Sequence, residues 1–131
     1  MTPKFRAWDK HSQKMFANDE LLIWNNNVYA NDSKKLTCNN LKGWSIDDEY
    51  LMQSTGLRDK NGKEIFEGDI LDYKGRKALV RWHGSYASFI YRFVDELQNR
   101  KTEWKPLYLA YMKCEIIGNI YENRELLEDK E

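Results

Sequence analysis

The chain has 131 residues, which is the usual size of one domain. A chain of this length can form a hydrophobic core that is stable without a bound metal or a disulfide bond. Hydrophobic residues make up 41% and aromatic residues 14%, and 21 basic residues balance 21 acidic ones. A net charge of zero argues against a protein that coats nucleic acid or anionic lipid with its whole surface. The chain has no apolar signal core and no run near ~20 apolar residues, so we expect a cytoplasmic protein without membrane contact.

The cysteine content is low. Cys38 and Cys114 lie far apart and lack CxxC spacing, which favours free thiols in a reducing compartment over a disulfide scaffold. A single Cys38–Cys114 bridge is left open by the sequence. No spacing of ligand residues indicates a metal, and we expect no cofactor.

Alternating residues predict short strands in the first half of the chain. Residues 4–9 alternate, and apolar residues resume after a polar turn, which predicts a hairpin. The short apolar run at 21–24 favours another strand. The remaining expectations are a loop with one strand inside it over 25–40, and a turn near 44–49 that leads into a strand near 50–55.

The second half has clearer alternation. Residues 76–84 and 86–93 predict a hairpin that closes at Gly84-Ser85, and "LYLAYM" and "CEIIGNIY" predict further β-rich runs. Short strands with tight turns predict a mainly β fold with a small bent sheet or an SH3-like barrel. Asn123 is expected to cap a short C-terminal helix that carries Leu126 and Leu127. We expect one domain, 1–131, with a soft boundary between two lobes near 56/57.

The stretch "DKNGKEIFEGDIL" (59–71) combines two turn signals. A calcium loop would need an acidic residue and a glycine where Lys63 and Glu64 stand, and a phosphate loop would need clustered glycines before Lys-Ser/Thr. Asn61-Gly62 is instead a favoured two-residue hairpin turn, and Gly68-Asp69 permits a sharp corner into the next strand. The sequence therefore predicts a structural role for this stretch.

Other polar residues are candidates for catalytic groups. Glu67 and Asp69 are two apart, so on a strand they would share a face for acid–base chemistry, but binding to turn backbone is the favoured role. The acidic run 47–49 is expected to be an exposed turn. His11 and His83 have no partner at ligand spacing, and a Cys114–His83 dyad is disfavoured because free cysteines on strands are usually buried apolar groups. We therefore predict no catalytic residues.

The zero net charge hides a segregated layout. The segment from Lys74 to Lys105 contains eight basic and three acidic residues, whereas the segment from Glu115 onward contains six acidic and two basic residues. Aromatic residues are interleaved with the basic run, a pattern that can bind single-stranded nucleic acid. The alternative is a solvated hairpin face whose charges pair between copies of an oligomer, and the neutral balance favours it. The candidate nucleic-acid or partner surface comprises Arg76, Lys77, Arg81, Tyr86, Arg92 and Trp104.

Three patches resemble the YopX family of bacteriophages and prophages of Gram-positive bacteria. They are "FRAWD" at 5–9, "QSTGLRDKNGKEIFEGD" at 53–69 and "IGNIYEN" at 117–123, and together they span nearly the whole chain. Ser54 departs from the pattern, since an aromatic residue is common there, and Arg124 stands where proline is common. The resemblance implies a phage-encoded cytoplasmic protein that is made mainly of strands and assembles from several copies. It implies no reaction.

These observations predict a non-enzymatic accessory protein that assembles with itself or binds a protein partner. The alternative is a nucleic-acid-binding module that uses the 74–105 region.

Overall fold

The computed structural model describes residues 4–10, 12–24, 27–30, 44–46, 50–97 and 104–127. The chain divides into two compact units, Met1–Gln53 and Ser54–Glu131. The expected boundary near 56/57 lies close to this division. The expectation of one domain stays a prediction.

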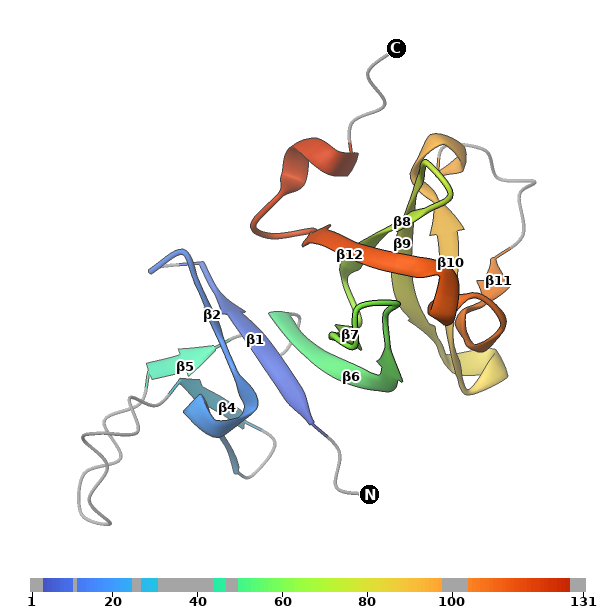
Figure 1. Cartoon of the computed structure of the whole chain (residues 1–131). Coiled ribbons are helices and arrows are strands. Elements are labelled where there is room, and N and C mark those ends of the chain that lie inside the picture. Colours follow the sequence, from blue (N-terminus) through green and yellow to red (C-terminus); the bar gives the residue numbers. More distant parts are fainter. Residues whose placement is uncertain are drawn as a thin grey trace. The chain divides into compact units, whose positions relative to one another are not determined.

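The first unit consists of short antiparallel strands (Figure 1). β1 (Phe5–Asp9) pairs with β2 (Lys14–Phe16) and with the first residues of β6 (Leu51–Arg58). A 3-10 turn, η1 (Asn18–Glu20), leads into a second sheet with the order β3 (Leu21–Trp24), β4 (Asn27–Ala30) and β5 (Trp44–Ile46).

The sequence expectations for this unit are mostly confirmed. The hairpin of β1 and β2, the strand at 21–24 and the strand inside 25–40 are all present. Trp44–Ile46 was expected to belong to a turn and instead forms strand β5, because it pairs with β4. The acidic run 47–49, His11 and Cys38 lie outside the described residues.

The core of the first unit follows from strand register. Ala7 faces Phe16 on one side and Leu51 on the other, and both Ala7 and Phe16 are buried. Leu21 and Tyr50 pack against them. Because directly paired residues share one face of a sheet, this register collects the apolar side chains in a single cluster.

The second unit is a curled five-stranded antiparallel sheet (Figure 1). Its order is β11 (Lys105–Pro106), β10 (Ser88–Phe93), β9 (Arg76–His83), β8 (Asp69–Tyr73) and β12 (Cys114–Asn119). β7 (Glu64–Phe66) pairs with the end of β6. The 3-10 turns of this unit are η3 (Gly84–Tyr86), η4 (Val94–Glu96), η5 (Leu107–Leu109), η6 (Tyr111–Lys113) and η7 (Arg124–Leu127).

Both faces of this sheet are covered. The larger core contains buried side chains from β7, β8, β9, β10, η5 and β12 and from the residue between η5 and η6: Ile65, Leu71, Ala78, Val80, Tyr91, Phe93, Leu107, Cys114 and Ala110. On the opposite face Ile70, Leu79 and Ile120 pack with Leu126 and Leu127 of η7. The apolar runs "IL" of β8 and "ALV" of β9 are unbroken because each of these strands is buried on both sides.

The turns between these strands use different backbone geometries. Lys74 and Gly75 both have positive φ, at 51° and 88°, which is the two-residue type I′ geometry that matches strand twist. After η3 the chain enters β10 through Ala87, whose φ is 47°. The predicted hairpin of 76–84 and 86–93 is confirmed by the β9–β10 pairing.

The mainly β class is confirmed, and two local expectations need correction. "LYLAYM" does not form a strand: it forms η5 and η6, because Leu107, Ala110 and Cys114 are buried at intervals of three and four residues, a helical period. The C-terminal helix is only the 3-10 turn η7. Asn123 precedes η7: its carbonyl accepts a hydrogen bond from the Leu126 N–H at 3.0 Å, and its Oδ1 accepts one from the Asn119 N–H at 3.2 Å. The SH3-like topology stays a prediction.

Candidate functional site

The turn between β6 and β7 is organised by one carboxylate. Oδ1 of Asp59 accepts hydrogen bonds from the N–H groups of Asn61 (3.0 Å) and Lys63 (2.8 Å). The N–H of Gly62 donates to the Asp59 carbonyl at 2.9 Å, and Gly62 has a φ of 84°. The hairpin is therefore confirmed, but it closes through the four-residue turn 59–62, which ends in a left-handed glycine, rather than through a two-residue turn.

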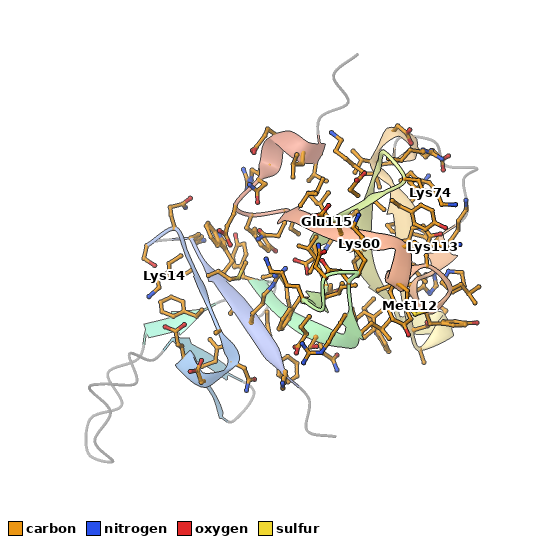
Figure 2. The ribbon with its side chains drawn as sticks, in the orientation of Figure 1. Lys14, Lys60, Lys74, Met112, Lys113 and Glu115 are labelled. Carbon is orange, nitrogen blue, oxygen red and sulfur yellow. The ribbon has the colours of Figure 1, made fainter. Side chains whose placement is uncertain are left out.

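The same turn covers the outer edge of β12. Oδ2 of Asp59 accepts a hydrogen bond from the Ile116 N–H at 2.9 Å, and the Lys60 N–H donates to the Cys114 carbonyl at 2.9 Å. Lys60 and Glu115, labelled beside each other in Figure 2, form an ion pair at 3.8 Å. Uncovered strand edges invite pairing with other chains. The turn closes this edge.

The protonation of Asp59 reflects these contacts. Burial raises the pKa of Asp59, but the hydrogen bonds from the backbone of Ile116, Lys63 and Asn61 together outweigh burial. The pKa therefore lies below its usual value of 3.8. The carboxylate is charged at neutral pH and acts as the acceptor for backbone N–H groups.

The acid pair Glu67 and Asp69 is also bound to backbone. Oε2 of Glu67 accepts from the Trp82 N–H at 3.2 Å, and Oδ2 of Asp69 accepts from the Phe66 N–H at 2.8 Å. Gly68 lies between them with a φ of 87°, and it donates to the Val80 carbonyl and accepts from the Ile120 N–H. The expected sharp corner is present. Within the described residues, no group of three or more His, Cys, Asp or Glu side chains is arranged to hold a metal ion.

Cys114 is a free, buried thiol at the start of β12. Its Sγ donates to the Ala110 carbonyl at 3.2 Å. Burial, with smaller contributions from the negative charges of Asp72 and Asp59, raises the pKa of this thiol to about 11. Because the thiolate is the nucleophilic form, this environment opposes nucleophilic chemistry at neutral pH.

Not all members of the predicted nucleic-acid or partner surface come together in the structure. Arg76 forms ion pairs with Asp95 (2.8 Å) and Glu96 (2.9 Å), and its guanidinium lies 3.7 Å from the ring centroid of Phe93. In the register of the β8–β9 pair, Lys77 lies directly opposite Asp72. Tyr86 belongs to η3, and its side chain, like Arg100, Lys101 and Glu103, lies outside the described parts.

Arg81, Arg92 and Trp104 are brought to one face of the sheet. The register pairs Arg81 with Ile90 and Arg92 with Leu79, so the two arginines are diagonal rather than direct cross-strand neighbours. The Arg92 guanidinium lies 5.6 Å from the Trp104 ring centroid, a cation–π distance. Arg81 is exposed.

A surface that the sequence did not indicate lies on η5 and η6. Tyr108, Leu109 and Met112 are 61%, 70% and 71% exposed, far more than the apolar side chains beside them. The expectation of a strand over "LYLAYM" concealed this surface. The signal that was available is the spacing of Leu107, Ala110 and Cys114, which predicts helical turns with the intervening side chains outward.

Comparisons with known proteins identify a family and similar solved structures. A family model described as YopX protein matches residues 4–128. The crystal structure of protein EF1440 from Enterococcus faecalis is similar, with a TM-score of 0.57 and 27% sequence identity over 98% of this chain and 99% of that chain. No curated protein matches the chain. In the described residues no helix is long and apolar enough to cross a membrane.

Proposed function

Since the chain belongs to the YopX family, we propose that it is a phage-encoded, cytoplasmic, non-enzymatic module that assembles with its own copies or docks a protein partner. The observation that carries this proposal is the group of large apolar side chains exposed on η5 and η6. Contiguous exposed apolar residues on soluble proteins commonly mark interaction surfaces.

The roles of the acidic side chains and the thiol support a non-enzymatic activity. Asp59, Glu67 and Asp69 each accept hydrogen bonds from backbone N–H groups. These contacts fix turns and strand edges, where a carboxylate is needed for stability rather than proton transfer. Cys114 is held as a thiol by burial.

Light scattering coupled to size exclusion tests self-assembly. We expect a defined multiple of the 15.7 kDa chain mass that persists on dilution. A strictly monomeric species at all concentrations would remove self-assembly and leave only the docking of a partner.

A second candidate function is binding of single-stranded nucleic acid. Its support is the face that carries Arg81 together with the Arg92–Trp104 cation–π pair. Arginine pairs with phosphate, and an indole ring stacks on a base. This function predicts that a labelled oligonucleotide binds at low salt and that Arg81→Ala with Arg92→Ala weakens binding. If the labelled oligonucleotide shows no binding even at low salt, nucleic-acid binding is excluded.

A further inference from the structure

The exposed apolar side chains sit on a rigid support. Leu107, Ala110 and Cys114 are 0%, 4% and 1% exposed and anchor η5 and η6 to the larger core. The Ala110 N–H donates to the Leu107 carbonyl at 2.9 Å, and the Lys113 N–H donates to the Ala110 carbonyl at 3.0 Å. A surface that is already ordered loses little conformational entropy when it binds.

The outward side chains lie on two consecutive 3-10 turns. Ala110, with a φ of -129° and a ψ of -17°, separates the turns, and Leu109 ends η5 whereas Met112 is the middle residue of η6. Tyr108 is the neighbour of Leu109 on the same turn. We call the group Tyr108, Leu109 and Met112 the apolar surface.

Two lysines flank the apolar surface in the sequence. Lys105 precedes η5 and Lys113 ends η6, and both are exposed. Lys113 follows Met112 directly, and Figure 2 labels both in the second unit. The Lys105 ammonium lies 5.1 Å from the Phe93 ring centroid. Among the ion pairs of the described residues, neither lysine is matched by a carboxylate.

We propose that the apolar surface binds a short acidic, amphipathic segment of another protein. The large apolar side chains of that segment contact Tyr108, Leu109 and Met112, and its carboxylates face Lys105 and Lys113. This inference rests on the proposed function and names the class of partner.

Charge complementarity selects this partner over two others. A two-fold contact between copies of this surface would bring the lysines of one copy toward those of the other, and like charges across an interface are unfavourable. A nucleic acid would satisfy the lysines through its phosphates but would leave aliphatic Leu109 and Met112 without apolar partners. An acidic amphipathic peptide satisfies both features.

Selection from a library of random 16-residue peptides displayed on phage tests the proposal, with the intact chain as bait. We expect the selected peptides to be enriched in Asp and Glu together with Leu, Phe or Trp. Synthetic copies of these peptides should bind about tenfold more weakly to a Leu109→Ser, Met112→Ser variant. The charge-reversed variant, Lys105→Glu with Lys113→Glu, should instead select peptides enriched in Lys and Arg.

Two control variants define the specificity. Ile117→Ser removes another exposed apolar side chain, and Lys74→Glu reverses another exposed lysine. Neither should change peptide binding. Circular dichroism establishes that each variant is folded.

The outcomes separate the proposal from the broader function. Selection without acidic enrichment, or equal binding to the Leu109→Ser, Met112→Ser variant, overturns the proposal. If that variant instead loses oligomeric mass in light scattering, the occupant is a second copy; the inference fails while the proposed function stands. A monomeric chain that selects no peptides contradicts both.

Discussion

The stretch 59–69 and the stretch 107–113 use their side chains in opposite ways. In the first, carboxylates of Asp59, Glu67 and Asp69 turn inward to backbone N–H groups of neighbouring strands. In the second, small and apolar residues hold the chain to the core, and Tyr108, Leu109 and Met112 face solvent.

This difference shows that residue type alone does not reveal which stretch is functional. Turns rich in Asp and Gly suggest ligand loops, yet here their polar groups are occupied by the fold itself. The run "LYLAYM" suggests core, yet among the large apolar side chains of the described residues it presents the three that are most exposed. If the comparison is right, changes in 59–69 should reduce stability and changes in 107–113 should reduce binding.

The largest expected effect is that of Asp59→Ala. Three backbone N–H groups lose their acceptor, and the Ile116 N–H at the β12 edge is left without the carboxylate. Hydrogen bonds to charged groups contribute about 1.5–3 kcal/mol each, though not additively, so we expect the free energy of unfolding to fall by about 3 kcal/mol. Urea unfolding measures the change. Exposed Glu125→Ala is the control and should change it by less than about 0.5 kcal/mol.

Gly118→Ala should have the next largest effect. A Cβ at Gly118 would lie 2.5 Å from Oδ1 of Asn123 and 2.8 Å from Cδ1 of Leu126. Relieving this overlap displaces η7 from the Ile70–Leu79 face, at an expected cost of about 2 kcal/mol.

The matched control for this substitution is Gly84→Ala. A Cβ at Gly84 meets nothing within 4 Å. Its unfolding midpoint in urea should stay close to that of the parent chain. An equal loss of stability for both variants would show that the packing of η7 against Gly118 has no special importance.

The pH dependence of stability is a smaller effect of the same carboxylate. The pKa of Asp59 is lower in the folded chain than its usual value of 3.8. The charged Asp59 carboxylate therefore makes its full contribution to the free energy of unfolding at pH values above the unfolded pKa. This contribution is lost as pH falls through the folded pKa. We expect Asp59→Asn to flatten the acid limb of stability below about pH 4, measured by urea unfolding across pH. An unchanged acid limb would contradict the assigned role.

The smallest expected effect on stability is that of Leu109→Ser with Met112→Ser. Leu109 and Met112 are 70% and 71% exposed, so the free energy of unfolding should change by about 0.5 kcal/mol or less. Thermal unfolding is the measurement. A loss of several kcal/mol would mean that these side chains belong to the core.

The sequence predicted those parts of the fold that depend on local periodicity. Alternation located the hairpin of β9 and β10, and the turn residues located the corner at Gly68 and the hairpin at Gly62. Strand β5 was missed because three residues are too few to show an alternating pattern. Its extended conformation depends on pairing with β4, which the local sequence does not reveal.

The candidate site could not be predicted in the same way. Whether Tyr108 or Leu109 faces core or solvent depends on which residues anchor η5 and η6, and a strand and a 3-10 turn place them differently. The acceptor role of Asp59 toward Ile116 joins residues 57 positions apart, and no local signal encodes that contact. Ser54, which departs from the family pattern, accepts a hydrogen bond from the Gly56 N–H at 3.1 Å.

Hydrogen exchange at the Ile116 amide tests the central claim most directly, because that claim assigns the Asp59 carboxylate to the edge of β12. In Asp59→Ala, exchange at Ile116 should accelerate about tenfold more than exchange at Ile70, which reports global unfolding. Equal acceleration at the two amides would contradict the account, since the carboxylate would then not protect that edge.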